Sequence, residues 1–363
     1  MSMKKYLAAL VIAIISLSAA AQTTDDYAYT EAADLTVLGK VFPDTPEPYK
    51  RMDYTKHGGW TKNDRRLLDM SSGIIISFKT DSPAIVVKAE LEKADRTGNS
   101  GWATRGFDLY IKKDGKWMWA GVKHAPDDIE KSPVLKIVEN MSEGSKECLL
   151  YLPLFSVLKS VKIGVEPGRT LIPGDRPFRH DIVIHGSSFM HGASTSRAGA
   201  TVPAMLTRNT GLQFNSLGVS GDCKMQPQFA EALKDAKADA FVFDAFSNPS
   251  AEVIEERLFP FLETVRSTHP GVPIIFISSI YRGNRNFDVK LDEKETAKEK
   301  MAEKLMKEAC RKYKDVYFIK SDASCPDHET TTDGTHPGDF GYYLWTRSIE
   351  KPLLKILKKY GIR

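Results

Sequence analysis

The stretch Asp181-Ile-Val-Ile-His-Gly-Ser-Ser-Phe-Met-His-Gly192 decides the fold of the second half of this 363-residue chain. It is a compact apolar run that ends in small and polar residues, which is typical of a buried parallel strand leading into a helix. The alternation of such runs with helical stretches predicts an α/β domain with an open, doubly wound parallel sheet. Ligands bind at the carboxyl ends of the strands in sheets of this kind. The other four runs are Phe214–Leu217, Ala240–Phe243, Pro273–Ile277 and Val316–Ile319, and the helical stretches lie near 199–210, 225–236, 251–267, 291–313 and 339–358.

The amino half has the rhythm of an antiparallel β domain. Short alternating runs are separated by turn residues, and no strong helical pattern interrupts them, which predicts a β-sandwich or jelly roll. The Pro- and Gly-rich segment 167–177 is the expected linker. We therefore expect an extension at 22–34, the β-sandwich at 35–175 and the α/β domain at 176–363. The runs are Gly73–Lys79, Ala84–Lys88, Phe107–Ile111, Lys116–Trp119, Val134–Val138, Cys148–Leu152 and Val161–Val165.

The first residues have the pattern of a secretory signal peptide. Lys4 and Lys5 precede an unbroken apolar stretch, and small residues before Gln22 supply a cleavage site. The apolar stretch is shorter than the roughly 20 residues that span a bilayer, although an uncleaved anchor is the alternative. The sequence thus predicts a signal peptide at 1–21 and a periplasmic or secreted protein with no stable membrane anchor after cleavage.

Composition and charge exclude several classes of protein. With 42% hydrophobic and 27% charged residues, the chain is neither disordered nor collagen-like. The 51 Lys and Arg against 47 Asp and Glu give a net charge of +4, too small to indicate a nucleic-acid partner.

Cys310 and Cys325 are the one pair worth testing as a disulfide, with free thiols an equally good interpretation. The Cys, Asp, His and Glu side chains at 325–336 fit no zinc-ligand spacing, so no metal is expected.

Two groups of residues at strand ends have the chemistry of nucleophilic catalysis. Ser188 leaves the first strand of the α/β domain between Gly186 and Gly192, where main-chain N–H groups can face a developing oxyanion. After the last strand, Asp333 and His336 stand three residues apart, so that the carboxylate can orient the imidazole as a general base. Each pattern alone also fits a structural turn or a helix cap. Because both groups come to one edge of the sheet, together they predict a Ser-His-Asp site.

These two segments resemble blocks of the SGNH, or GDSL-type, hydrolases. Residues 186–192 resemble the G-D-S-x-x-x-G block, and residues 333–336 resemble the D-x-x-H block. The resemblance implies that Ser188 is the nucleophile, Asp333 the orienting acid and His336 the base. It also implies a flavodoxin-like, three-layer α/β/α fold for the carboxyl-terminal domain.

Two further blocks supply the oxyanion hole that the resemblance implies. Residues 215–221 resemble the second block, whose glycine donates a main-chain N–H, and this role falls on Gly221. Residues 244–248 end at the position of the third block's asparagine, which makes Asn248 the side-chain donor. The main-chain N–H of Ser188 completes the set.

The chain also departs from these blocks. Ser187 stands where the first block has Asp, and Phe246 and Pro249 replace the Gly and the final Asp of the third block. The amino half contains Gly106-Phe-Asp-Leu-Tyr110, which resembles the G-x-D-L-Y signature of a domain found attached to SGNH hydrolases. Residues 192–199 also look like that subgroup, so the resemblance covers most of the chain.

The sequence therefore predicts an exported serine esterase that needs no metal or organic cofactor and acts on a small-molecule or polysaccharide ester. Removal of acetyl or other short acyl groups from carbohydrate is the favoured reaction. A lipid acyl-ester hydrolase or thioesterase and a catalytically silent carbohydrate-binding protein are the alternatives. His185, His191 and Arg197 are candidate substrate contacts, although a structural role is the simpler interpretation of each histidine. The oligomeric state and the contribution of the amino-terminal domain to the site are left open.

Overall fold

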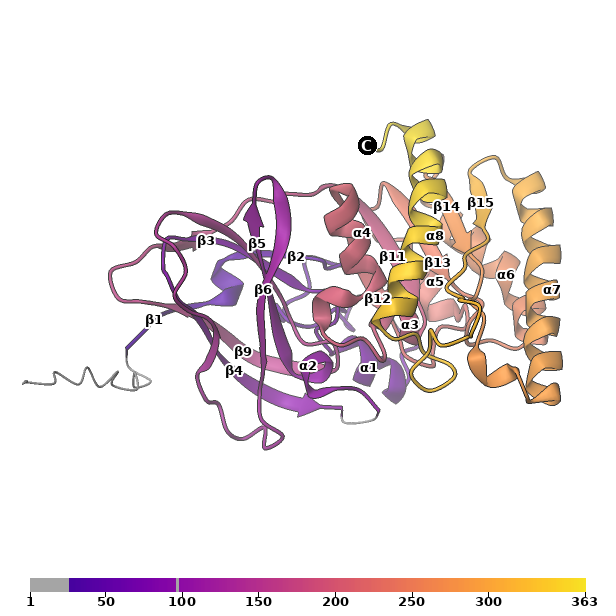
Figure 1. The fold of residues 1–363 in the computed structure, drawn as a ribbon. Helices are drawn as coiled ribbons and strands as arrows, with labels where there is room; N and C mark the ends of the chain where they lie inside the picture. Colours follow the sequence, from indigo (N-terminus) through magenta and orange to yellow (C-terminus); the bar gives the residue numbers. More distant parts are fainter. Residues whose placement is uncertain (1–25, 96–97) are drawn as a thin grey trace, which may run out of the picture.

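The computed structural model describes residues 26–95 and 98–363, so the predicted signal peptide at 1–21 lies outside the described residues. Figure 1 shows a β-sandwich side by side with an α/β domain, with the α7 helix at the far end from the sandwich. Across the described ranges, no helix is both long and apolar enough to span a membrane.

The α/β domain is built on one parallel sheet of five strands, ordered β12-β11-β13-β14-β15. Numbered from the start of the domain this order is 2-1-3-4-5, the flavodoxin-like arrangement, which confirms the predicted fold. Strand β11, which leads to the predicted nucleophile Ser188, lies between β12 and β13, so the ends of these three strands adjoin. The strands are β11 (Arg179–Gly186), β12 (Leu212–Gly218), β13 (Ala240–Asp244), β14 (Ile274–Ile277) and β15 (Val316–Ile319).

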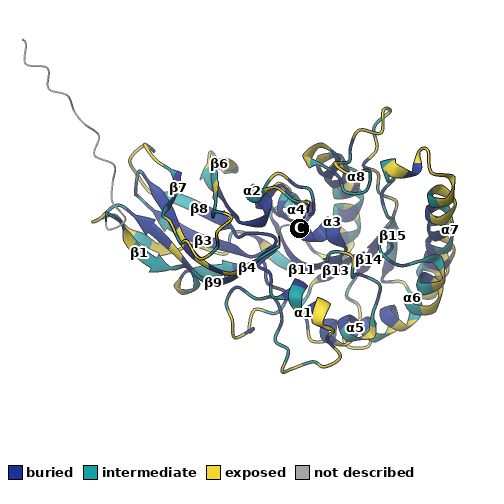
Figure 2. Cartoon of the chain, turned by 90° about the horizontal axis from the view of Figure 1, so that it is seen from below, coloured by how far each residue is buried: buried dark blue, intermediate teal, exposed yellow. Residues whose placement is uncertain are grey.

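Helices cover both faces of this sheet. Because side chains alternate along a strand, Ile182 and Ile184 pack with α4 and α8 on one face, while Val183 faces the α5, α6 and α7 side. The outer surfaces of α6 and α7 are exposed and their inner surfaces are buried, as amphipathic surface helices require (Figure 2). The helices are α3 (Ser188–His191), α4 (Val202–Thr210), α5 (Pro227–Leu233), α6 (Ala251–Arg266), α7 (Val289–Lys312) and α8 (Asp339–Leu357), with short 3-10 turns at Ala198–Ala200, Gly283–Arg285 and Lys358–Tyr360.

The amino-terminal domain is an antiparallel β-sandwich, as predicted. One sheet has the order β1-β9-β4-β7, and the other has β10-β3-β8-β5-β6 with β2 paired to β3. Inward-facing side chains such as Phe78, Phe107 and Ile163 fill the space between the sheets. The strands are β1 (Ala28–Glu31), β2 (Thr36–Leu38), β3 (Ile75–Thr80), β4 (Ile85–Ala94), β5 (Gly106–Lys113), β6 (Lys116–His124), β7 (Leu135–Val138), β8 (Lys146–Tyr151), β9 (Ser156–Val165) and β10 (Leu171–Pro173), and the helices are η1 (Ala32–Asp34), α1 (Lys62–Leu68) and α2 (Gly101–Thr104).

The strand pairing corrects the predicted amino-terminal extension and the predicted linker. The described part of the expected 22–34 extension contains β1, which pairs with β9 and so belongs to the sandwich. The expected linker at 167–177 contains β10, which pairs with β3. Both strands are short and lie at sheet edges, where a few polar or proline residues hide the alternating pattern.

The two domains share one apolar core. Side chains of the sandwich such as Leu67 and Leu149 belong to the same buried cluster as Leu217 and Phe241 of the α/β domain. The fully buried Arg51 crosses this boundary, because its guanidinium donates to Leu67 O at 2.6 Å and Met70 O at 2.9 Å in one domain and to Gly218 O at 2.9 Å in the other. Burial lowers the pKa of Arg51 to about 10.

The connection between the domains is also bound down. Gly174 N donates to Ser77 O at 3.0 Å, and Gly174 O accepts from Thr36 Oγ1 at 2.6 Å. Ser77 Oγ donates to Asp175 O at 2.8 Å. The chain therefore passes from sandwich to α/β domain without a free linker.

Candidate active site

Ser188, the predicted nucleophile, lies at a tight turn from strand to helix. Gly186 ends β11, and a Cβ at this position would lie 2.4 Å from Met190 Cγ and 2.8 Å from Asp244 Cβ, so only glycine fits. Ser187 then caps α3 by accepting a hydrogen bond from Phe189 N at 3.2 Å. Ser188 is consequently the first helical residue, directly after the carboxyl end of β11, with 6% of its surface exposed.

The structure brings the three predicted catalytic side chains together. Ser188 Oγ lies 2.9 Å from His336 Nε2, and His336 Nδ1 lies 2.8 Å from Asp333 Oδ2. The imidazole ring also meets the edge of Phe189 at a centroid distance of 5.7 Å, which limits its rotation. With Nδ1–H donated to the carboxylate, Nε2 is left to accept the proton of Ser188.

Asp333 is held by the loop that carries the base. Its Oδ1 accepts from His336 N at 2.7 Å and from Thr335 N at 2.9 Å. Partial burial raises the pKa of the Asp333 carboxyl, but these N–H donors and the imidazole outweigh it, so the net pKa lies below its usual value. Asp333 is therefore ionised at neutral pH, as an orienting acid must be.

Two of the predicted oxyanion donors lie in the loops that follow the strands on either side of β11. Gly221 is in the loop after β12 and has a φ of +72°, a left-handed conformation that favours glycine. Asn248 is in the loop after β13, and its Oδ1 accepts from Cys223 N at 3.1 Å. Because that contact fixes the amide, Asn248 Nδ2 remains as a donor. The Gly221 loop and Asn248 are thus tied together beside the end of the nucleophile strand.

Comparisons with known proteins agree with this geometry. Residues 179–354 match the model of the GDSL-like lipase/acylhydrolase family, and residues 27–171 match that of the G-x-D-L-Y domain at the amino terminus of SGNH-hydrolase-type esterases. A crystal structure of a GDSL-like protein from Bacteroides ovatus is 39% identical, covers 92% of this chain and 98% of its own, and superposes with a TM-score of 0.87. The chain belongs to the GDSL-like lipase/acylhydrolase family. It is accordingly a serine esterase by family.

More distant structures share the fold. The salicylyl-acyltransferase SsfX3 of a tetracycline biosynthetic pathway is 22% identical over 94% of this chain and all of its own, with a TM-score of 0.70. A family two carbohydrate esterase from Cellvibrio japonicus is 11% identical over 92% of this chain and 98% of its own, with a TM-score of 0.61. A search of curated protein sequences returned no match.

The structure corrects two of the candidate substrate contacts. His185 and His191 are 1% and 0% exposed and lie in the core beneath the site. His185 Nδ1 donates to Leu217 O at 2.8 Å, and His191 Nε2 donates to Leu154 O at 2.9 Å. Burial lowers the pKa of His185 to about 4 and places the pKa of His191 well below its usual value. Their closeness to Ser188 in sequence was misleading, because strand and helix direct both rings inward.

Arg197, the third candidate, is bound to the family's G-x-D-L-Y segment. Its Nη1 donates to Asp108 Oδ2 at 2.9 Å and to the Tyr110 hydroxyl at 2.5 Å. Asp108 is fully buried and also accepts from Gly199 N at 2.8 Å and Trp119 Nε1 at 2.9 Å. Asp108, the signature acid of the sandwich, thus anchors the loop that follows Ser188.

Other contacts join the sandwich to the loops around the site. Asn63 Nδ2 of α1 donates to Asp222 Oδ2 at 2.7 Å, next to Gly221. Ser100 Oγ, at the start of α2, donates to Ser196 O at 3.0 Å. Ser196 N in turn donates to Asp339 Oδ1 at 2.8 Å, three residues beyond His336. The amino-terminal domain therefore helps to position the catalytic loops, a contribution that the sequence left open.

The largest departures from the family blocks have structural substitutes. Phe246, which replaces a glycine, is 2% exposed and stacks on Phe276 at a centroid distance of 5.7 Å. Ser187, which replaces Asp, donates to the buried carboxylate of Asp244. The sequence motifs indicated no role for Asp244. Its position as the last residue of a buried strand, next to the altered block, was the available signal.

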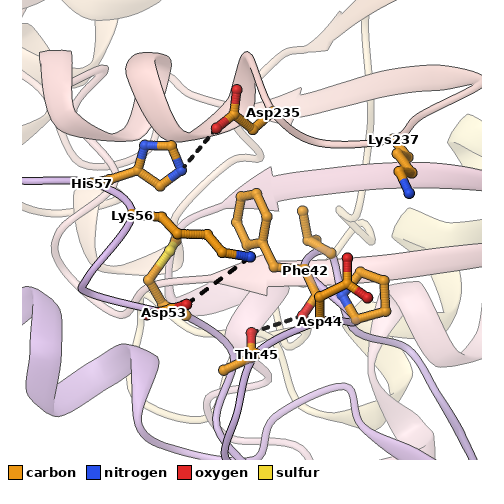
Figure 3. A pocket seen from close by; sticks show the side chains of 11 residues that line it. Phe42, Asp44, Thr45, Asp53, Lys56, His57, Asp235 and Lys237 are labelled. Atoms are coloured by element: carbon orange, nitrogen blue, oxygen red, sulfur yellow. Dashed lines mark hydrogen bonds and ion pairs between the residues drawn. The ribbon is translucent and has the colours of Figure 1, made fainter.

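A cavity of about 110 Å³ lies away from this chemistry (Figure 3). It is formed between the segment 41–57 and residues just before β13, at the amino end of the sheet. Two pairs of its polar side chains contact each other, His57 Nε2 with Asp235 Oδ2 at 3.4 Å and Lys56 Nζ with Asp53 Oδ2 at 4.0 Å. No residue of the Ser188 site lines it.

The cysteine and acidic residues add no further site. Cys310 and Cys325 are free thiols in the structure, in agreement with the free-thiol interpretation of the sequence. Among the residues that the structure describes, no group of His, Cys, Asp and Glu side chains has the geometry of a metal site. The His328 ring of the 325–336 segment packs instead on Tyr281 at a centroid distance of 4.9 Å.

Proposed function

We propose that this chain is an exported esterase that removes acetyl or other short acyl groups from carbohydrate through an acyl-enzyme on Ser188. The observation that carries the catalytic part is the chain of contacts from Ser188 Oγ to His336 Nε2 at 2.9 Å and from His336 Nδ1 to Asp333 at 2.8 Å. Serine, imidazole and carboxylate in this order activate a hydroxyl for attack on an ester carbonyl.

The reaction follows from the residue types. His336 Nε2 takes the Ser188 proton as Oγ attacks the carbonyl carbon, and the oxyanion is held by Ser188 N–H, Gly221 N–H and Asn248 Nδ2. His336 then gives the proton to the leaving sugar oxygen as the ester bond breaks. A water molecule next attacks the acyl-enzyme carbonyl and gives a proton to His336, which passes it to Ser188 Oγ as the acyl-enzyme bond breaks and the carboxylic acid leaves. Each oxyanion donor is expected to lower the barrier by about 3 kcal/mol.

The carbohydrate part rests on different support. The Cellvibrio japonicus protein with this fold is a family two carbohydrate esterase, and a protein from Butyrivibrio proteoclasticus with a TM-score of 0.53 is an acetyl xylan esterase. The predicted signal peptide would bring the enzyme to extracellular or periplasmic glycans. Amino-terminal sequencing of the mature protein from separated cell fractions tests export, and the expected first residue is Gln22.

Hydrolysis of p-nitrophenyl acetate, compared between the wild type and Ser188→Ala, tests the mechanism. We expect the variant to lose at least about 10³-fold in kcat, because no other group replaces the nucleophile. Ser267→Ala is the matched control, since this exposed hydroxyl at the end of α6 bonds only to Thr264 O among the hydrogen bonds of its side chain in the described structure. Equal turnover by Ser188→Ala, or no turnover by the wild type on any ester, would refute the proposal.

The acyl and alcohol parts of the substrate are tested separately. A p-nitrophenyl ester series from acetate to decanoate should show kcat/KM falling with acyl length, and acetylated xylan should release acetate. A rise in kcat/KM toward long acyl chains would favour the lipid acyl-ester alternative. Glycan binding without acetate release would favour the catalytically silent alternative.

A further inference from the structure

Asp244 is a buried acid at the active site to which the proposed mechanism gives no role. It is the last residue of β13 and is 0% exposed. Its Oδ2 accepts from Ser187 N at 3.0 Å and from Ser187 Oγ at 2.6 Å, and its Oδ1 accepts from Ser247 Oγ at 2.6 Å. All three contacts are donated to the carboxylate, which is the pattern expected of a buried acid that serves as an acceptor.

The two partners of Asp244 are the residues directly before two catalytic groups. Ser187 precedes the nucleophile Ser188, and Ser247 precedes the oxyanion donor Asn248. One carboxylate group therefore joins the loop that carries the attacking atom to the loop that carries a donor for the developing charge. Such a bridge controls the distance between the Ser188 hydroxyl and the Asn248 amide. An error of about 1 Å in the position of a catalytic group costs on the order of 100-fold in rate.

The Ser247 end of the bridge is itself fixed. Ser247 O accepts from Lys298 Nζ of α7 at 3.1 Å and from Arg282 Nη2 in the loop between β14 and α7. Lys298 is paired with Glu295 at 2.9 Å, and both are at most 5% exposed at the side chain. The loop that carries Asn248 is therefore held from the helix layer and from the carboxylate at once, with little freedom to move alone.

The bridge also accounts for the altered first block. The chain has Ser187 at the position where the first block of the family has Asp. The acid that lies next to Ser187 is instead Asp244, at the end of the neighbouring strand β13. We propose that Asp244 is the positioning residue of the active site, in which Ser187 and Asp244 together replace the acid of the first block and set the nucleophile against Asn248. This inference rests on the proposed function, because it concerns the rate of acylation at Ser188.

An exchange of the two side chains tests the proposal. Asp244→Ser removes the carboxylate, and Ser187→Asp places a second carboxylate against the first; we expect each to lower kcat for p-nitrophenyl acetate by about 100-fold with KM changed less than about 3-fold. The double variant Ser187→Asp/Asp244→Ser again has one carboxylate and one hydroxyl between the same two loops. We expect it to recover at least about 10-fold in kcat over either single variant.

A role in packing alone makes a different prediction, because the losses of two core substitutions would then accumulate. A double variant no faster than Asp244→Ser, or an Asp244→Ser variant with wild-type kcat, would overturn the proposal. Asp315→Ser is the matched control, since Asp315 is 7% exposed, binds Arg266 at 2.8 Å and lies at the opposite end of the same sheet. It should lower stability and leave kcat per folded molecule unchanged.

Two further measurements separate the possible failures. Circular dichroism and thermal melting establish that each variant is folded, and Ser187→Ala and Ser247→Ala supply milder changes that keep the carboxylate and remove one donor each. We expect these to lower kcat by about 10-fold, and wild-type kcat in both would count against the bridge. The wild type and Ser188→Ala are measured alongside: if the wild type does not turn over, the proposed function fails, whereas an active wild type with no recovery in the exchange variant overturns only the role of Asp244.

Discussion

Replacing Arg197 with methionine should destabilise the protein through the acid that it leaves behind. The Asp108 side chain is 0% exposed and that of Arg197 is 26% exposed, so the substitution leaves a carboxylate in the protein interior without its cation. Breaking a buried pair in this way costs about 3–5 kcal/mol. Because Gly199 N–H and Trp119 Nε1–H still donate to Asp108, we expect the lower end of that range, about 3 kcal/mol.

The double variant Asp108→Asn/Arg197→Met should lose less than the sum of the two single losses, by about 2 kcal/mol, because it leaves no unpaired charge. Urea unfolding followed by far-UV circular dichroism measures these free energies. Arg347→Met is the matched control, since Arg347 is 58% exposed at the side chain and pairs with Glu350 on the surface, so its loss should cost less than about 1 kcal/mol.

The pH dependence gives a second signature of the same pair. Burial raises the pKa of Asp108, and Arg197 opposes this effect, so loss of Arg197 raises that pKa further above its value in the unfolded chain. In the variant, the folded state then binds more protons than the unfolded state as pH falls through this pKa. The deficit of Arg197→Met relative to wild type should therefore shrink as the pH is lowered from neutral toward this raised pKa. A cost below about 1 kcal/mol, strict additivity in the double variant or a deficit that grows with acid would refute this account.

Three other measurements test the site and its support. Asn248→Asp keeps the acceptor for Cys223 N but loses the amide donor, so kcat for p-nitrophenyl acetate should fall on the order of 100-fold with KM nearly unchanged, and a wild-type kcat would remove Asn248 from the oxyanion hole. Asp333→Asn should lower kcat on the order of 10³- to 10⁴-fold, because the amide favours the wrong tautomer of His336; a loss below 10-fold would contradict the orienting role. The pKa of His185 is about 4 in the folded state and near 6.5 in the unfolded state. Because the folded state binds fewer protons between these pH values, the free energy of unfolding should fall by roughly 3 kcal/mol as the pH is lowered from 6.5 to 4. His185→Asn, which keeps a donor for Leu217 O, should show a shallower acid loss in urea unfolding, and an unchanged slope would be evidence against a buried neutral imidazole.

The sequence predicted the parts of the structure that local pattern controls. All five parallel strands are compact apolar runs, and the predicted catalytic residues Ser188 and the Asp333/His336 pair follow the first and last of them. Helix α1 was missed, although Thr61 and Asp64 form a capping box that marks its start, because its seven residues carry few apolar side chains. The sites of His185 and His191 were misjudged because nearness to Ser188 along the chain does not determine the direction of a side chain.

The contacts that span the two domains were beyond prediction for a physical reason. Asp108 and Arg197 are 89 residues apart, and neither residue type alone specifies a partner. The G-x-D-L-Y segment indicated a domain type and not a contact with the loop after the nucleophile. The role of Asp244 was also beyond prediction from the sequence, because an acid at the end of a strand can equally lie in a solvated turn.

Because the sandwich and the α/β domain share one apolar core, neither domain is a separable module. Topology would allow the gene to be cut near Asp175, but the catalytic half would then expose Leu217 and the carbonyl of Gly218, and would lose the acid that holds Arg197. Such a half is a poor candidate for transfer to another protein by recombination. The two domains form one structural unit, and engineering of the enzyme must exchange loops within that unit and leave the domains together.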